Sequence, residues 1–205
     1  MKKISLSILL IFLILVVQAQ DSKELPPNSI QLFSAYSKHG TDNVDGFAMM
    51  IDYNHHFSKR FSWEASIGTT LHDGTKEVSY WDSSGNLVYG PVNFTTSGVQ
   101  TGLLFGFDVV RTSRHSFQVC LGPLLRYQST SNPDIVGLAI TFPYNSRVDF
   151  PARTLSFGGI GTISYSYTFR NNLFVHLQAC LQYDSNDDAL NMFGVGVGKR
   201  FSKIE

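Results

Sequence analysis

Apolar and polar residues alternate along most of the chain, and the clearest example begins at Phe47. One face of that run carries Phe47, Met49, Ile51, Tyr53, His55 and Phe57, and the other carries Ala48, Met50, Asp52, Asn54 and His56. Successive side chains of a β-strand point to opposite faces, so this period of two predicts a strand with one apolar and one more polar face.

The same alternation recurs along the rest of the chain. A weaker run starts at Ile30, and clear runs cover residues 61–71, 99–109, 117–127, 155–169, 173–183 and 193–201. Each has close to the roughly 9–11 residues that a tilted strand needs to cross a bilayer. The pattern therefore predicts about eight membrane-spanning strands and no long helix.

The connections between these runs alternate in length. Those at 58–60, 111–115 and 170–172 are short, whereas those at 38–45, 72–97, 129–152 and 184–189 are longer. Short periplasmic turns and longer external loops are typical of an up-and-down outer-membrane barrel. Within 72–97, the turn signal at 82–86 predicts a hairpin that extends beyond the membrane. A turn at Asp73–Gly74 would instead give ten strands.

The first nineteen residues have the pattern of a signal peptide. Lys2 and Lys3 precede an apolar stretch over 4–17, and Val17-Gln18-Ala19 places small or β-branched residues at the cleavage positions. We therefore expect a signal peptide over 1–19 and a barrel domain over 20–205. The mature part contains no second long apolar run, so we predict no transmembrane helix there.

Composition excludes several classes of protein. The 205 residues include 16 basic and 16 acidic residues, which gives no electrostatic footprint for a nucleic-acid partner. Charged residues are 16% and aromatic residues 13% of the chain, which is too apolar for a disordered protein. The mean hydropathy of −0.02 is that of a chain whose apolar and polar faces cancel.

Aromatic residues gather beside the short turns and the C-terminal end. Amphipathic rings suit the boundary between hydrocarbon and headgroups, so we predict an aromatic girdle there. Its members are Tyr53, Phe57, Phe61, Trp63, Tyr167, Phe169 and Phe201.

With these features, the chain resembles the small OmpA/OmpX-like and porin-like outer-membrane barrels. The Gln18-Ala19-Gln20 junction and the aromatic-rich strands are similar to Bacteroidetes members, and the strand 192–201 resembles the segment that such barrels present to the barrel-assembly machinery. The resemblance implies an all-β transmembrane barrel in a Gram-negative outer membrane, with outer-membrane lipid and the assembly machinery as partners. It further implies a monomer without a cofactor, and it names no extracellular ligand.

An eight-stranded barrel is just wide enough for its side chains to fill the interior. We expect opposite charges there to pair, because an unpaired buried charge is costly. The predicted polar network of the lumen consists of Asp52, Glu64, Asp108, Arg126 and Arg200. Aromatic residues of the long loops, Tyr80, Trp81 and Tyr89, are candidate contacts for an external molecule.

Three other groups of residues give only weak support for a catalytic, metal or disulfide site. His56 and Ser58 with Glu64 have the residue types of an esterase but abut a short turn, away from the external leaflet. His55 and His56 point to opposite faces of one strand and lack a third metal ligand. Cys120 and Cys180 both face inward, but another strand separates theirs and we place them at different heights, so we expect free thiols.

The sequence therefore favours a non-enzymatic outer-membrane barrel with a structural, surface-interaction or weak small-solute permeation role. A soluble exported barrel that binds an apolar ligand, as lipocalins do, is the alternative. A lipid-modifying barrel enzyme is a third. The soluble barrel and the membrane barrel differ in which face is apolar, since a soluble binder is apolar inside and a membrane barrel is apolar outside.

Overall fold

The protein is described by a computed structural model that covers residues 25–40, 44–81, 84–131 and 152–202. The predicted signal peptide lies outside the described residues. Eight strands form a closed barrel in chain order. They are β1 (Asn28–His39), β2 (Val44–His56), β3 (Phe61–Trp81), β4 (Leu87–Arg111), β5 (His115–Thr130), β6 (Ala152–Thr168), β7 (Leu173–Asp184) and β8 (Ala189–Phe201).

Every strand is antiparallel to its neighbours in the sequence, and β8 closes the barrel by pairing with β1. This last ladder runs from Asn28 opposite Phe201 to His39 opposite Leu190. Closure leaves no free sheet edge around the barrel wall. The predicted all-β, up-and-down barrel with eight strands is confirmed, and the ten-strand alternative is wrong. Among the described residues, no helix is long and apolar enough to cross a membrane.

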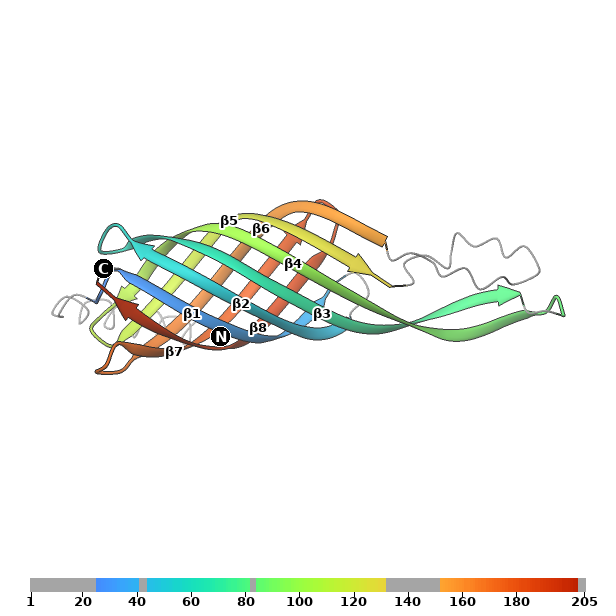
Figure 1. Cartoon of the computed structure of the whole chain (residues 1–205), viewed down its shortest axis with the longest axis horizontal. Helices are drawn as coiled ribbons and strands as arrows, with labels where there is room; N and C mark the ends of the chain where they lie inside the picture. Colours follow the sequence, from blue (N-terminus) through green and yellow to red (C-terminus); the bar gives the residue numbers. More distant parts are fainter. Residues whose placement is uncertain (1–24, 41–43, 82–83, 132–151, 203–205) are drawn as a thin grey trace, which may run out of the picture.

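The β3–β4 hairpin continues far past the other strands. Pairing persists without interruption from Phe61 opposite Phe107 to Trp81 opposite Leu87, so Asp73–Gly74 does not form a turn. Figure 1 shows this hairpin projecting from one end of the barrel, opposite the end where β8 finishes and where the turns after β2, β4 and β6 lie. We call these the loop end and the turn end.

The connections at the loop end differ from the expectation. Those after β1 and β7 occupy only 40–43 and 185–188, no longer than the turn at 57–60. The residues that flank these connections were expected to lie in the loops, but they pair as parts of the strands, as Lys38 does with Asp45. The difference between the ends is therefore carried by the β3–β4 hairpin and by the connection between β5 and β6.

The burial of side chains follows the alternation. Along β7, exposed and buried residues alternate at every position. Large apolar residues such as Leu121 and Phe157 are 69% and 67% exposed on the outer face, whereas Arg126 is fully buried inside. The barrel is thus apolar outside, and charged and amide side chains fill much of its interior.

An apolar layer crosses the middle of the lumen. Its ten buried residues are Phe33, Ala35, Ala48, Met50, Leu104, Cys120, Leu124, Ile160, Cys180 and Met192. On most strands it lies between inward polar residues on both sides, as Cys180 does between Gln178 and Gln182 on β7. The inward glycines of β8 leave room beside it, because a Cβ at Gly196 would collide with the ring of His176.

Candidate functional site

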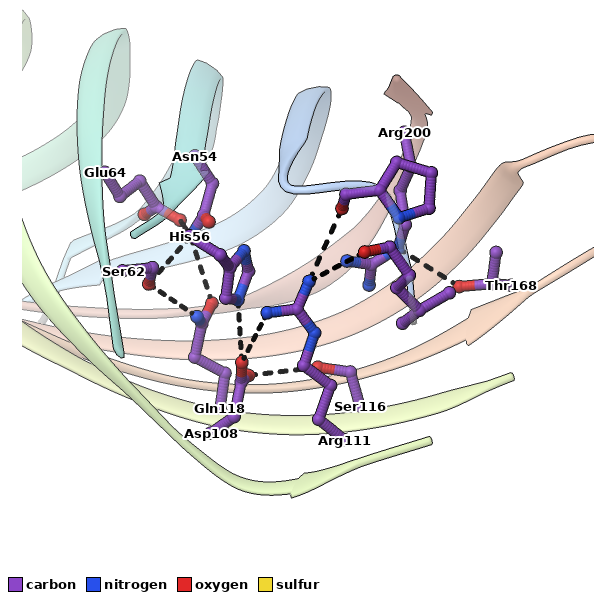
Figure 2. A network of polar contacts seen from close by, with 12 residues as sticks. Asn54, His56, Ser62, Glu64, Asp108, Arg111, Ser116, Gln118, Thr168 and Arg200 are labelled. Carbon is purple, nitrogen blue, oxygen red and sulfur yellow. Dashed lines mark hydrogen bonds and ion pairs between the residues drawn. The ribbon is translucent and has the colours of Figure 1, made fainter. Parts of the chain in front are cut away.

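The apolar layer divides the polar residues of the lumen into two clusters. The turn-end cluster consists of Asn54, His56, Ser62, Glu64, Asp108, Arg111, Ser116, Gln118, Thr168 and Arg200 (Figure 2). The loop-end cluster consists of Ser37, His39, Thr70, His72, Arg126, Gln128, Ser156, Asp184 and Asp188.

Asp108 is the centre of the turn-end cluster. One carboxylate oxygen lies 2.7 Å from His56 Nε2 and 3.6 Å from Arg111 Nη1, and the other accepts a hydrogen bond of 3.2 Å from Ser116. A β-bulge between Asp108 and Val110 shifts the register of β4 against β5. Bulges re-aim side chains, and here Asp108 and Arg111 both reach the same point of the lumen.

Arg111 also holds the described start of the chain across the turn end. Its Nη2 donates to the carbonyls of Leu25 and Pro26, at 3.4 Å each. The backbone N–H of His56 donates to the carbonyl of Pro27 at 2.8 Å. The segment 25–27 is therefore fixed to the same residues that surround Asp108.

Amide side chains surround the two buried carboxyl groups of β2 and β3. Asn54 Nδ2 donates to Glu64 and to Gln118, at 3.3 Å each, and Gln118 donates to Ser62 at 2.9 Å. Asp52, one step nearer the apolar layer, accepts a hydrogen bond of 3.0 Å from Gln31. These carboxyl groups are thus held by neutral donors.

Arg200 contacts neutral groups too. Its Nε donates to Thr168 at 3.2 Å, and its guanidinium lies 4.9 Å from the centre of the Phe174 ring. A cation over an aromatic face is attracted by the ring quadrupole, and more strongly when water is excluded.

The loop-end cluster is organised around Arg126 and Asp188. Arg126 lies 3.8 Å from Asp184 and 3.5 Å from the Thr70 hydroxyl. Asp188 accepts a hydrogen bond of 2.8 Å from Gln128 and lies 3.5 Å from His39. Because Asp188 belongs to the 185–188 connection, these contacts tie that connection to strands β1 and β5.

All five residues of the predicted lumen network lie inside the barrel, but in separate places. Asp108 and Arg200 belong to the turn-end cluster and Arg126 to the loop-end cluster, and no ion pair in the described part of the chain joins two of the five. Their partners include His56, Arg111 and Asp184. Arg111 is not among the residues predicted to line the lumen, because only the bulge in β4 turns it inward.

The turn-end cluster lacks the geometry of a hydrolase. In a catalytic triad the histidine lies between the nucleophile and the acid. Here the acid is central, since His56 and Ser116 both contact Asp108, so no base takes the serine proton. Ser58 is exposed in the 57–60 turn, where its N–H donates to Phe61.

Metal and thiol chemistry find little support in the described residues. No group of three His, Cys, Asp or Glu there could hold a metal ion. Cys120 and Cys180 are free, as expected. Both pair with Thr162, in one hydrogen-bonded row across three strands. Two strand spacings, about 9.6 Å, separate them too widely for a disulfide.

The residues of the predicted girdle lie near the turn end and contact one another. Tyr53 lies 5.3 Å from Trp63 and 6.4 Å from Phe201 between ring centroids, and Tyr167 lies 5.3 Å from Phe169. Phe57 and Phe61 stack at 6.5 Å.

A second group of outward aromatic residues lies toward the loop end. Its members Tyr36, Phe47, Tyr127 and Tyr183 are about half exposed. Tyr36 and Tyr183 donate hydrogen bonds to Asp45 and Asp187, the latter at 2.7 Å. These four are not among the predicted girdle residues, although outward aromatic residues close to a connection were a usable signal.

The candidate loop contacts lie on the projecting hairpin. Tyr80 and Trp81 end β3, and Tyr89 is near the start of β4. The Tyr89 side chain is 73% exposed. The hairpin therefore places these residues away from the barrel body.

Solved structures with a similar fold are small outer-membrane barrels. Ail, the attachment invasion locus protein of Yersinia pestis in complex with the heparin analogue sucrose octasulfate, has 11% identity and a TM-score of 0.55, over 86% of this chain and 100% of that chain. Neisserial surface protein A has 13% identity and a TM-score of 0.55, over 87% and 100%. No protein-family model and no curated protein sequence matches. The similarity confirms the barrel fold that the resemblance implied.

Proposed function

We propose that this protein is a non-enzymatic barrel of a Gram-negative outer membrane, which presents the β3–β4 hairpin outside the cell and is closed to solutes. Residues 1–19 direct its export. The turn end faces the periplasm and the loop end faces the outside, which is the usual orientation of a barrel whose longer connections are external. Tyr80, Trp81 and Tyr89 are then available to an external molecule.

The observation that carries this proposal is that the outer face of the barrel is apolar and its interior is polar, which is the reverse of a soluble protein. Large apolar residues are exposed all round the outside, while charged residues such as Asp52 and Arg126 are fully buried inside. In water that outer surface would be a large aggregation-prone patch. In hydrocarbon it is well solvated, and the interior polar groups are shielded from lipid. A lipocalin-like soluble binder would need the opposite arrangement.

Closure of the lumen supports a structural and surface role over permeation. Phe33, Leu104 and Ile160 are at most 1% exposed, and they lie in a layer that separates the two polar clusters. A polar solute that crossed this layer would lose its hydration without gaining hydrogen bonds. At the turn end, Arg111 and the segment 25–27 close the lumen again.

The first experiment tests membrane insertion and orientation. An epitope tag is inserted at 84–86, in the tip of the hairpin, and in a matched variant at 112–114, a turn at the opposite end. We expect both proteins to be in the outer-membrane fraction and to migrate differently on gels before and after boiling. Antibody should label intact cells only for the tag in the hairpin. Recovery in the soluble periplasm, or labelling of the 112–114 tag on intact cells, would contradict the proposal.

The second experiment tests closure. The purified barrel is reconstituted into planar bilayers, and we expect no discrete channel openings. A variant in which Phe33, Leu104 and Ile160 are all replaced by serine removes three members of the apolar layer and should pass current. Openings of the unaltered protein would show a pore.

A further inference from the structure

A groove on the outer surface of the barrel is apolar along its length and cationic at one end. It runs over β8 between β1 and β7, with a volume of about 1040 Å³. Small-molecule sites commonly have volumes of about 300–1,000 Å³. Apolar side chains line most of it, namely Ile30, Leu32, Ile51, Leu173, Val175 and Val197.

The cationic end of the groove is built by the turn after β6. Arg170 and Asn171 from the 169–172 turn and Lys199 from β8 line it there. Lys199 is placed directly between Leu173 and Ile30 by its strand pairing. The groove lining contains no acidic residue, so its positive charge is not offset by its own walls.

This turn is held in a fixed conformation. The N–H of Phe169 donates to Leu173 at 2.7 Å, and that of Asn172 donates to Phe169 at 3.1 Å. The backbone N–H of Arg200 donates to the carbonyl of Asn172 at 2.9 Å, and this hydrogen bond holds the turn against β8. The backbone that carries Arg170 is thus ordered before any ligand binds, which lowers the entropic cost of binding.

We propose that this groove binds one anionic phospholipid of the periplasmic leaflet. The inference rests on the proposed function, since it requires the turn end to lie at that leaflet. One acyl chain lies along the apolar walls over Val197, and the phosphate contacts Arg170 and Lys199. The occupant follows from complementarity, because a phospholipid joins an apolar chain to an anionic headgroup, as the groove joins its two parts. Each interfacial cation near an anionic headgroup favours binding.

The remaining turns provide a matched control. Arg60 and Arg114 are exposed cations in the 57–60 and 112–114 turns at the same end of the barrel, but neither lines the groove. Replacing both removes the same charge from the same rim. General attraction of anionic lipid to the rim would be weakened equally by either pair of substitutions, whereas a specific site would not.

The experiment measures lipid retained by the folded barrel. Protein is extracted into neutral detergent from vesicles of phosphatidylethanolamine and phosphatidylglycerol, and bound phosphatidylglycerol is counted by native mass spectrometry. We expect one retained molecule, a loss of about tenfold or more in the Arg170→Gln/Lys199→Gln variant, and little change in the Arg60→Gln/Arg114→Gln variant. Val197→Phe, which fills the groove with both cations intact, should also reduce retention.

Equal losses in the two double variants, or unchanged retention in Val197→Phe, would overturn the lipid site. Folding is checked for each variant by the shift in gel migration on boiling, and Val197→Phe keeps the test decisive if the cation variant does not fold. If the unaltered protein never inserts into the vesicles, the proposed function fails instead. The two failures are therefore distinguishable.

Discussion

The two polar clusters of the lumen contain similar residue types but are held differently. At the turn end, Asp108 contacts His56, Arg111 and Ser116 at 2.7–3.6 Å. At the loop end, Arg126 reaches Asp184 and Thr70 only at 3.8 and 3.5 Å. A buried charge with several close partners stabilises a fold more than one held by a single long ion pair. The difference indicates that the turn end is the firmer closure.

Removal of Asp108 should have the largest effect. Asp108→Ala leaves His56, Arg111 and Ser116 without their shared acceptor, so we expect a loss of about 3–5 kcal/mol in the free energy of unfolding. Urea titration of the barrel in lipid vesicles, followed by tryptophan fluorescence, measures it. Asp108→Asn keeps one acceptor oxygen and should lose less. An unchanged urea midpoint for Asp108→Ala would show that Asp108 does not organise this end.

The apolar layer that separates the clusters can be tested with two adjacent leucines. Leu104 is 1% exposed within the layer, and Leu103 is 57% exposed on the outer face. Leu104→Ala should cost about 2–5 kcal/mol, because it leaves a cavity as well as losing buried surface. Leu103→Ala should cost less, because lipid fills the space. Equal urea midpoints for the two variants would contradict a close-packed layer.

Removal of the loop-end arginine should cost less than removal of Asp108. In Arg126→Met the carboxylate of Asp184 keeps hydrogen bonds from Ser156 and from the N–H of Asn186, at 2.9 Å each. We therefore expect a loss of about 1–3 kcal/mol in the same titration. A loss that equals or exceeds that of Asp108→Ala would reverse the comparison between the two ends.

The sequence predicted the fold well because the alternation of apolar and polar residues can be recognised without knowing which residues contact one another. Every strand has one outward apolar and one inward face, so alternation alone identified the eight strands and the inward side of Asp52 and Arg126. The projecting hairpin was also predicted, because its turn signal lies between two alternating runs.

The partners inside the lumen were not predictable in the same way. They depend on register and shear between strands distant in the sequence, such as β2 and β4 for His56 and Asp108. A single bulge turned Arg111 inward, and the pairing of β6 with both neighbours put Cys120 and Cys180 in one row with Thr162. Alternation determines the face of a residue but not its height relative to other strands.

The smallest effect is expected at Asp188, where the loop-end cluster meets the 185–188 connection. Burial raises the pKa of this carboxyl, but the contacts with His39 and Gln128, together with the nearby charge of Arg126, outweigh burial and lower the pKa from 3.8 to about 2. A carboxyl whose pKa is lower in the folded state stabilises that state above its unfolded value and stops doing so as pH falls through the folded value. The contribution of Asp188 should therefore be complete above about pH 4 and fade toward about pH 2.

Asp188→Asn isolates this contribution, because the amide cannot ionise. We expect the variant to unfold at a slightly lower urea concentration than the unaltered barrel at pH 6, and the gap to close as both are titrated from pH 4 toward pH 2. The gap should be smaller than that caused by Asp108→Ala, because the asparagine side chain keeps an oxygen that can still accept the hydrogen bond from Gln128. A gap that stays constant across this pH range would mean that the carboxylate of Asp188 adds no charge-dependent stability to the loop end.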